Sequence, residues 1–373
     1  MKSEILQGLL YQLTGDICEA EELSNNRKFF LNMAKFKYDD YKQFSPGMRF
    51  IERFALWLNQ FKDLSDRKDA LDFVKNYLVY ISAPEMDLLV SSCYPDVIKP
   101  ILFKKVSAEL RIPEYKVSEI SNSTKFKSLL RQSLFCGLSD GARIEIFRRS
   151  NTGVLSHEQI YQTYELSAER ASKMHEELIL DIAKNLGKDP EIHEGKFKVL
   201  FLLDDFSASG TSYLKFSSVE NKLKGKINAL YESINKDDLK SVFDLDNLEV
   251  HIILYLCTEQ AKTTIISNFQ RLQEKFTLKN IPKLHIVHLI PDEYKISAAN
   301  NQPIYNLCNK NLYYDGDTLE DSHTGEVKLG FSGCALPVIL YHNCPNNSLS
   351  ILWAYENAKF GGLFPRVPRH KEL

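Results

Sequence analysis

The most informative segment of this chain reads Val199-Leu200-Phe201-Leu202-Leu203-Asp204-Asp205-Phe206-Ser207-Ala208-Ser209-Gly210-Thr211-Ser212. The nearly continuous apolar run over residues 196–203 predicts a central strand of a parallel sheet, buried on both faces. Two acidic residues and a turn of small hydroxylated residues follow this run. Because ligands of open parallel sheets bind beyond the carboxyl ends of the strands, the turn lies where a ligand site is expected.

The turn suits a phosphate group, and the acids before it suit hydroxyl groups. Hydroxyl and backbone N–H groups can surround a phosphate at a helix N-terminus, and glycine allows close backbone approach. The residues expected to do so are Ser209, Gly210, Thr211 and Ser212. Asp204 and Asp205 would repel a phosphate but suit sugar hydroxyls or a hydrated Mg²⁺ ion. A sugar phosphate satisfies both halves; the alternative is a strand followed by a structural Asp/Ser turn.

This segment resembles the phosphoribosyl-pyrophosphate loop of type I phosphoribosyltransferases, in which an apolar strand, two acids, two usually apolar residues and a hydroxyl/Gly turn follow one another. The resemblance implies that Asp204 and Asp205 hold the ribose 2′- and 3′-hydroxyls. It also implies that the residues from Ala208 to Ser212 bind the 5′-phosphate. The chain departs from the pattern at Ser207, which is usually aliphatic, and at Ala208, where purine-type members often carry an acidic base. These departures argue against a purine-salvage role.

Four further strings extend the resemblance to roughly residues 45–370. They lie at residues 137–143, 147–151, 155–159 and 342–349. With the Asp-Asp loop they resemble the phosphoribosyltransferase-like effectors of bacterial conflict systems. That family implies a role in anti-phage defence, in some loci beside retron reverse transcriptases, and a partner such as a reverse transcriptase nucleoprotein.

A second loop follows the short apolar run at residues 133–138. Its residues are Ser139, Asp140, Gly141, Ala142 and Arg143. In type I phosphoribosyltransferases the loop after the first strand binds pyrophosphate, and the resemblance implies the same here. Gly141 and Ala142 would expose backbone N–H groups, and the guanidinium of Arg143 would bind phosphate oxygens. The alternative is a helix cap followed by solvated arginines.

Two other regions carry weaker functional signals. Residues 150–163 are polar and would suit a mobile loop over the substrate, with His157 and Glu158 as candidate bases. The alternative is a helix start with Ser156 as cap and Gln159 completing a capping box. Cys334 and Cys344 have no evident base partner, so buried structural thiols are the favoured interpretation. The basic residues at the end of the chain either touch nucleic acid or are solvated: Arg366, Arg369, His370 and Lys371.

Periodicity predicts two domains. Residues 1–125 read as a mainly helical domain, and residues 126–373 as a parallel α/β domain of the type I phosphoribosyltransferase kind. The boundary is expected within residues 115–130, where Ser, Asn and Thr cluster. The expected strands are 133–138, 196–203, 248–257 and 284–290, with a helix over 167–185.

Bulk composition limits the classes of function. The 47 basic and 49 acidic residues give a net charge of 47 − 49 = −2, without the footprint of a dedicated nucleic-acid binder. The net charge does not exclude local basic patches. The seven cysteines are scattered without a Cys-x-x-Cys motif, and no apolar run is long enough to span a membrane. We therefore expect a reduced cytoplasmic protein with no membrane partner.

The combined interpretation is an enzyme that acts at the anomeric carbon of phosphoribosyl pyrophosphate or a nucleotide, with Mg²⁺ as cofactor. Asp204, Asp205 and Arg143 are its candidate catalytic residues, and the two acids also hold the ion, through its waters or the ribose hydroxyls. The alternative is a non-catalytic module that binds such a ligand and regulates a partner protein or nucleoprotein. The missing acid at Ala208 favours this alternative modestly.

Overall fold

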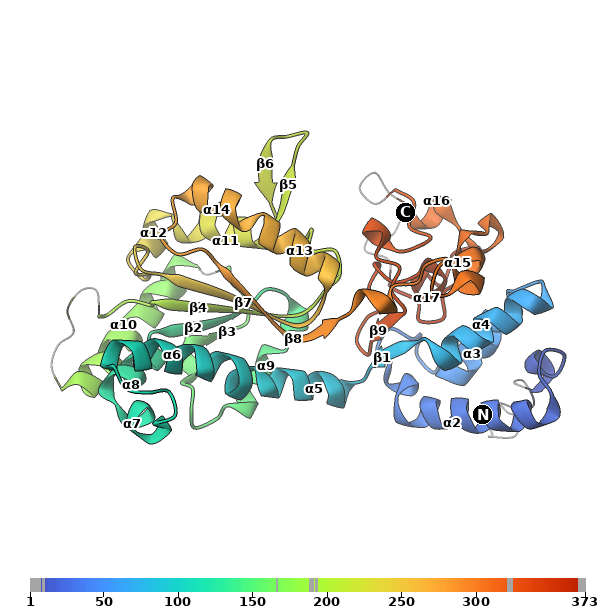
Figure 1. The fold of residues 1–373 in the computed structure, drawn as a ribbon, viewed down its shortest axis with the longest axis horizontal. Helices are drawn as coiled ribbons and strands as arrows, with labels where there is room; N and C mark the ends of the chain where they lie inside the picture. The colour runs from blue at the N-terminus through green and yellow to red at the C-terminus, as the bar shows by residue number, and fades with distance from the viewer. Residues whose placement is uncertain are drawn as a thin grey trace. The chain divides into compact units, whose positions relative to one another are not determined.

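The computed structural model describes residues 8, 11–165, 167–187, 191, 194–320 and 325–367. Its contacts divide the chain into two compact units (Figure 1). One unit combines the two ends of the chain, Met1–Glu85 and Pro291–Leu373, and the other is Met86–Ile290. The α/β unit is therefore inserted, in sequence, between the two halves of the terminal unit.

The unit Met86–Ile290 contains a five-stranded sheet in the order β3-β2-β4-β7-β8, with every neighbouring pair parallel. The strands are β2 (Ser133–Gly137), β3 (Ile160–Tyr161), β4 (Val199–Ser207), β7 (Glu249–Thr258) and β8 (Lys283–Ile290). Val199 pairs with Ser133 of β2 on one side and with Glu249 of β7 on the other. The α/β class and all three long predicted strands are thereby confirmed, whereas the type I phosphoribosyltransferase arrangement stays a prediction.

Both faces of the sheet are buried at the apolar strands β2, β4 and β7, whereas the edge strand β8 is mostly half-buried. On one face, β2, β4 and β7 pack in an apolar core against α10, α11, α13 and α14 (Figure 1). The opposite face carries a row of stacked rings, in which Phe201 lies 5.2 Å from Phe135 and 5.1 Å from His251 between ring centroids. The helices of this unit are α5 (Ala83–Ser92, which begins in the terminal unit), η2 (Cys93–Ile98), α6 (Lys99–Leu110), α7 (Val117–Asn122), α8 (Thr124–Arg131), η3 (Asp140–Ala142), α9 (Ile144–Ser150), η4 (His157–Gln159), α10 (Ala168–Leu186), α11 (Lys226–Ile234), α12 (Asp237–Lys240), α13 (Glu259–Ser267) and α14 (Phe269–Phe276).

The central strand extends beyond its expected end. β4 continues to Ser207, because the ten-residue neighbour β7 still offers backbone partners there: Ser207 pairs with Cys257. The two acids therefore lie within the strand and not after it. The expectation of a helix directly after the turn is also wrong. A small antiparallel hairpin, β5 (Lys215–Ser217) and β6 (Lys222–Lys224), comes first, and α11 follows it.

The polar cluster near residues 115–130 belongs to helices. The side chain of Ser123 accepts a hydrogen bond from the backbone N–H of Phe126 at 3.1 Å and so caps α8. Residues 117–131 thus form part of the α/β unit. The compact units divide after Glu85 and after Ile290, whereas the sequence analysis places its division at residues 125 and 126.

The terminal unit is helical with one short sheet. Val79–Ile81 (β1) pairs in parallel with Val338–Leu340 (β9), which joins the two ends of the chain. Rings of Phe50, Phe54 and Phe364 stack in its core. Its other elements are α2 (Ala20–Phe36), η1 (Tyr38–Asp40), α3 (Phe50–Asn59), α4 (Leu64–Asn76), η5 (Asp292–Tyr294), α15 (Gln302–Asn309), η6 (Asn311–Tyr313), α16 (Gly316–Leu319), η7 (Phe331–Gly333) and α17 (Ser350–Trp353). Among the described residues, no helix combines the length and the apolar character that a membrane crossing needs.

Candidate functional site

The two predicted ligand loops follow adjacent parallel strands, at the point where the chain reverses its direction across the sheet. From β2 the chain proceeds to β3 on one side, whereas from β4 it proceeds to β7 on the other side. The chain segments that leave the carboxyl ends of the adjacent strands β2 and β4 therefore run to opposite sides, which is the usual location of ligand crevices in open parallel sheets. Residues 139–143 follow β2, and residues 208–212 follow β4.

Asp204 joins the two halves of this site. Its carboxylate is fully buried. The Ser139 hydroxyl donates to Oδ1, the Tyr213 hydroxyl donates to Oδ2 at 2.6 Å, and the Lys226 ammonium lies 3.0 Å from Oδ2. The backbone N–H of Asp205 also donates to Oδ1 at 3.1 Å. Asp204 therefore holds the 139–143 loop, β4 and the start of α11 together.

Burial and the neighbouring Asp205 disfavour the charged form of the Asp204 carboxyl. Burial raises the pKa of its carboxyl, and the charge of Asp205 raises it further; Lys226, Ser139 and Tyr213 act in the opposite direction. Burial also raises the pKa of Tyr213 well above its usual value, as do both acids. Tyr213 thus stays a neutral donor to Asp204. Two neighbouring acids at a strand end impose a cost on folding that a purely structural turn does not need.

Asp205 lies differently from Asp204. Its side chain is half-buried, and Oδ1 accepts a hydrogen bond from the backbone N–H of Phe206 at 2.8 Å. Its carboxylate approaches the 139–143 loop so closely that a Cβ atom on Gly141 would lie 2.4 Å from Oδ2. Glycine at residue 141 therefore leaves room for the carboxylate in this position. Of the two acids, Asp205 is the one with exposed surface for a ligand.

The 139–143 loop is held by hydrogen bonds from several directions. The Ser139 hydroxyl accepts from the backbone N–H of Gly141 at 3.1 Å and caps η3. The hydroxyl of Tyr255 on β7 donates to the carbonyl oxygen of Ala142 at 2.6 Å. Arg143 adopts the left-handed conformation, with φ of 51°, immediately before α9. A non-glycine residue in this region marks a backbone that surrounding contacts have fixed.

The 208–212 turn is tight, and one glycine makes it possible. Gly210 has φ of +75°, and a Cβ there would lie 2.8 Å from the carbonyl oxygen of Ala261 in α13. The hydroxyls of Ser209 and Thr211 lie 2.9 Å apart, and the Thr258 hydroxyl donates to the carbonyl of Ala208 at 2.5 Å. Gly210 is thus needed for packing against α13 as well as for any approach by a ligand. The turn does not open a helix, so the expected helix-dipole contribution is absent.

Sequence reasoning missed three side chains that shape this site: Tyr213, Lys226 and Tyr255. Tyr213 lies one position beyond the predicted loop, and Lys226 follows the hairpin, 22 positions after Asp204. Tyr255 comes from a neighbouring strand. No local pattern singles out these residues, because their roles depend on pairings between distant segments.

The 150–163 segment is held by structural contacts. Ser156 and Gln159 form the capping box of η4, as the structural alternative predicted, although the helix is a short 3₁₀ turn. The Gln159 amide also donates to the carbonyl oxygens of Leu130 and Ser133, at 2.7 and 2.9 Å. The Glu158 carboxylate lies 4.0 Å from the guanidinium of Arg170. His157 lies in the same turn, and its role as a base stays a prediction.

The tail contacts are structural as well. Cys334 and Cys344 are buried free thiols, and burial raises the pKa of each, to about 11 for Cys334. The guanidinium of Arg366 donates to the carbonyl oxygen of Cys344 at 2.7 Å. The other three basic residues of the tail, Arg369, His370 and Lys371, lie outside the described residues.

The side chains of the site fit a hydrated Mg²⁺ ion in part. Among the residues that the structure describes, no group of three or more His, Cys, Asp or Glu side chains could hold a metal by itself. Asp204 has an ammonium group beside it, which disfavours a second cation there. Mg²⁺ in nucleotide sites is commonly bound by one or two carboxylates together with substrate phosphates and water. Asp205 can serve as that carboxylate.

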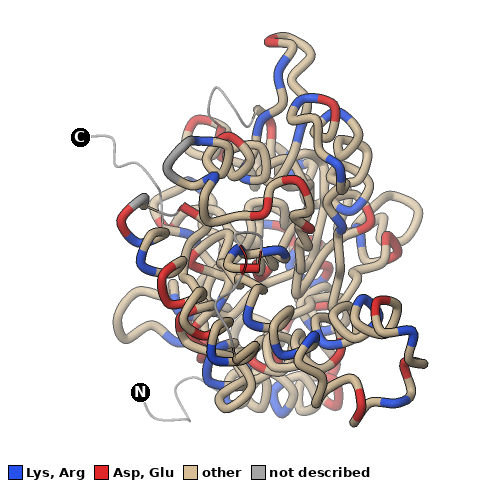
Figure 2. The backbone as a smooth tube through the Cα atoms, turned by 90° about the vertical axis from the view of Figure 1, so that its left-hand side faces the viewer, with Lys and Arg blue, Asp and Glu red and all other residues tan. Residues whose placement is uncertain are grey.

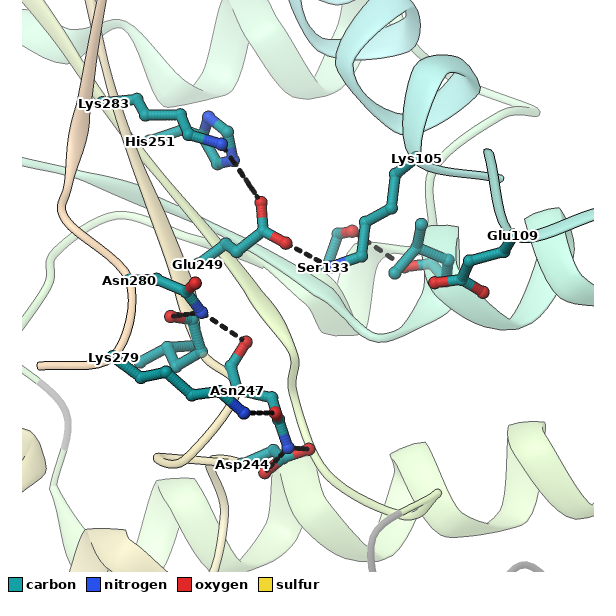
Figure 3. A network of polar contacts seen from close by, with 12 residues as sticks. Lys105, Glu109, Ser133, Asp244, Asn247, Glu249, His251, Lys279, Asn280 and Lys283 are labelled. Atoms are coloured by element: carbon teal, nitrogen blue, oxygen red, sulfur yellow. Dashed lines mark hydrogen bonds and ion pairs between the residues drawn. The ribbon is translucent and has the colours of Figure 1, made fainter. Parts of the chain in front are cut away.

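The opposite edge of the sheet contains a separate charged network (Figure 3). A cavity of about 560 Å³ lies there, at the amino-terminal ends of β4 and β7. Glu249 pairs with Lys105, and its Oε2 lies 3.6 Å from Lys283 and 3.5 Å from Nε2 of His251. His251 in turn lies 2.9 Å from His285. These side chains lie at the other end of the strands and belong to no predicted ligand loop.

A comparison with protein families settles the relationship of the chain. The model of the PRTase-CE family matches residues 54–366. The chain belongs to the PRTase-CE family. This match spans both compact units and supports a phosphoribosyltransferase-type function. Searches of curated proteins and of solved structures found no match.

Proposed function

We propose that this PRTase-CE protein acts at the anomeric carbon of phosphoribosyl pyrophosphate or a nucleotide, as an effector of anti-phage defence. The observation that carries the proposal is the hydrogen bond that Ser139, in the loop after β2, donates to Asp204 of the adjacent strand β4, which the 208–212 turn follows. The family match supports the reaction class. The defence setting rests on the resemblance to conflict-system effectors.

Each loop has a distinct task in the proposed reaction. The 208–212 turn binds the 5′-phosphate through its hydroxyl and N–H groups, and the carboxylate of Asp205 accepts hydrogen bonds from the ribose hydroxyls. Arg143 binds the pyrophosphate that leaves when the bond to the anomeric carbon breaks. The leaving group takes the bonding electron pair, and the sugar becomes cationic before the acceptor or water attacks it. Fixed charges around this centre supply orientation and electrostatic stabilisation.

Asp204 positions the site and does not contact the substrate directly. Its two oxygens are occupied by Ser139, Tyr213 and Lys226. Its proposed task is to fix the separation of the two loops before the ligand arrives. Bound Mg²⁺, held by Asp205 and by substrate oxygens, would neutralise the charge of the leaving pyrophosphate.

The second candidate function is non-catalytic binding of the same ligand, which then changes contacts with a partner such as a reverse transcriptase nucleoprotein. The engagement of Asp204 favours it, because only one of the two acids is exposed for a ligand. Ala208 favours it too, since the turn lacks the acid that often acts as base in related loops.

The experiment incubates the full chain with phosphoribosyl pyrophosphate and a panel of nucleotides, with Mg²⁺ or with chelator, and identifies products by mass spectrometry. The variant Asp205→Asn should lose product formation. Asp244→Asn is the matched control, because Asp244 is a half-buried acid at the opposite edge of the same sheet. Calorimetry on the same ligands separates the two functions. Product formation supports the enzyme, binding without product supports the regulatory module, and the absence of both overturns the proposal.

A further inference from the structure

The hairpin β5–β6 projects from the α/β unit and shares its base with the candidate site (Figure 1). The chain enters it from the 208–212 turn and leaves it into α11. The backbone N–H of Lys226 donates to the carbonyl of Ser212 at 3.0 Å, which closes the base. Gly225 has φ of +113°, and a Cβ there would lie 2.4 Å from the carbonyl oxygen of Tyr213. The hairpin is therefore rigidly joined to the phosphate-binding turn.

The two faces of this hairpin differ in character. Phe216 pairs with Leu223, and both pack toward the apolar core, with the guanidinium of Arg271 lying 4.7 Å from the Phe216 ring centroid. Residues on a strand alternate between the two faces. The opposite face therefore carries three lysines, namely Lys215, Lys222 and Lys224. We call these three residues the lysine face.

The lysine face contains a repulsive pair that folding does not need. Lys215 lies directly opposite Lys224 in the antiparallel register, and like charges in this position destabilise a sheet. Glu220 at the tip pairs with Lys224, and all three lysines lower its pKa, the hydrogen bond from Lys224 most strongly. One glutamate thus faces three lysines on the hairpin. Figure 2 shows this pattern at the top of the view, with basic segments along the hairpin and an acidic tip.

Two acidic side chains on the neighbouring helices are engaged in ion pairs with lysines outside the hairpin. Glu232 of α11 pairs with Lys275 at 2.8 Å, and Glu259 of α13 pairs with Lys262 at 3.2 Å. Within the hairpin, three lysines and the single acid Glu220 leave an excess of positive charge, although the net charge of the chain is −2. Like charges that are held together in excess are suited to a polyanionic partner.

We propose that the lysine face binds the phosphate backbone of a nucleic acid. A narrow two-stranded ribbon can enter a nucleic-acid groove, and lysines two residues apart on a strand present a regular row of cations. A membrane surface fits less well, because the ribbon's aromatic residue, Phe216, faces inward under Arg271. The proposal concerns a second binding surface and does not depend on catalysis at the two ligand loops.

The test is fluorescence anisotropy with a labelled 20-base-pair DNA duplex of mixed sequence, repeated over a range of salt concentrations. The triple variant Lys215→Gln, Lys222→Gln, Lys224→Gln should weaken binding about tenfold or more. The slope of log K against log salt should fall by about 2.7, which is 0.9 for each lost phosphate contact. The matched control is Lys104→Gln, Lys127→Gln, Lys173→Gln, which removes three exposed lysines without a described ion pair and should leave binding unchanged.

Circular dichroism checks that the triple variant folds. If it does not, the single variant Lys215→Gln, with an expected slope change of about 0.9, replaces it. Asp205→Asn should bind the duplex like the wild type, which separates this surface from the candidate active site. The proposal is overturned if the wild type does not bind the duplex, if the lysine and control variants behave alike, or if the wild type binds anionic phospholipid vesicles in place of DNA.

Discussion

Adding one methyl group at Gly141 should disable the site while the fold persists. The Cβ of Gly141→Ala would lie 2.4 Å from Oδ2, 2.6 Å from Cγ and 2.8 Å from Oδ1 of Asp205. Favourable separations of nonbonded heavy atoms begin at about 3.5 Å, so the carboxylate must move by about 1 Å. A displacement of this size at a reacting centre costs about 100-fold in rate.

The effect on stability should be small. The obstructing group is the end of a half-buried side chain, so crowding costs about 1 kcal/mol, at the low end for overpacked sites. Replacing glycine with alanine also reduces the entropy of the unfolded chain, which contributes about 0.4–1 kcal/mol in the opposite direction. Gly141 is not among the residues with positive φ, so alanine introduces no backbone strain. The two effects nearly cancel.

Product formation and ligand affinity are measured beside a thermal unfolding curve. Gly195→Ala is the control, because its Cβ would lie 3.0 Å from Cγ1 of Ile179, a milder crowding by an apolar side chain that precedes the opposite end of β4. We expect loss of activity for Gly141→Ala alone, with melting temperatures of both variants within a few degrees of the wild type. Full activity of Gly141→Ala would refute the assignment of Asp205 to the ligand.

Three further predictions address the interior, the pyrophosphate loop and the histidine pair. Tyr213→Phe removes the hydroxyl that donates to buried Asp204 at 2.6 Å, so urea unfolding should show a loss of about 1.5–3 kcal/mol; a loss below about 0.5 kcal/mol would mean that other groups hold Asp204 alone. Arg143→Ala should weaken the binding of phosphoribosyl pyrophosphate by about 10- to 150-fold and the binding of ribose 5-phosphate far less. Equal losses of affinity for the two ligands in calorimetry would remove Arg143 from the pyrophosphate-binding role. Burial, then His251 and Lys283, lower the pKa of His285 to about 4. The unfolded chain therefore binds more protons, and stability present above pH 6.5 should fall as pH decreases toward 4; His285→Gln should lessen this fall in urea midpoints measured between pH 7 and 5.

Local patterns were sufficient for the strands of the α/β unit. The run over residues 196–203 is apolar at nearly every position because β4 lies at the centre of the sheet with both faces covered. The turn could also be predicted, because two acids and small hydroxylated residues follow the apolar run. The last residue of the strand could not be predicted, since β4 continues only because β7 provides partners as far as Cys257.

The roles of the two acids were not separable from the sequence. Asp204 and Asp205 are adjacent and chemically identical, and alternation along β4 turns one inward and leaves the other half-exposed. The inward partners, Tyr213 and Lys226, come from segments that fold back onto the strand. The division of the chain was equally hidden, because pairing of β1 with β9 leaves no local signal.

The pairing of β1 with β9 has a consequence for biosynthesis. Val79 leaves the ribosome roughly 260 positions before its partner Val338, a delay of about 10–50 s at usual elongation rates. During this interval the nascent N-terminal half of the terminal unit lacks the segment that supplies Phe364, so aromatic side chains such as Phe50 stay uncovered. The inserted α/β unit has all its strands in one continuous segment and can fold first. Nascent chains should therefore engage chaperones through residues 1–85 until the segment from Val338 to Phe364 has emerged.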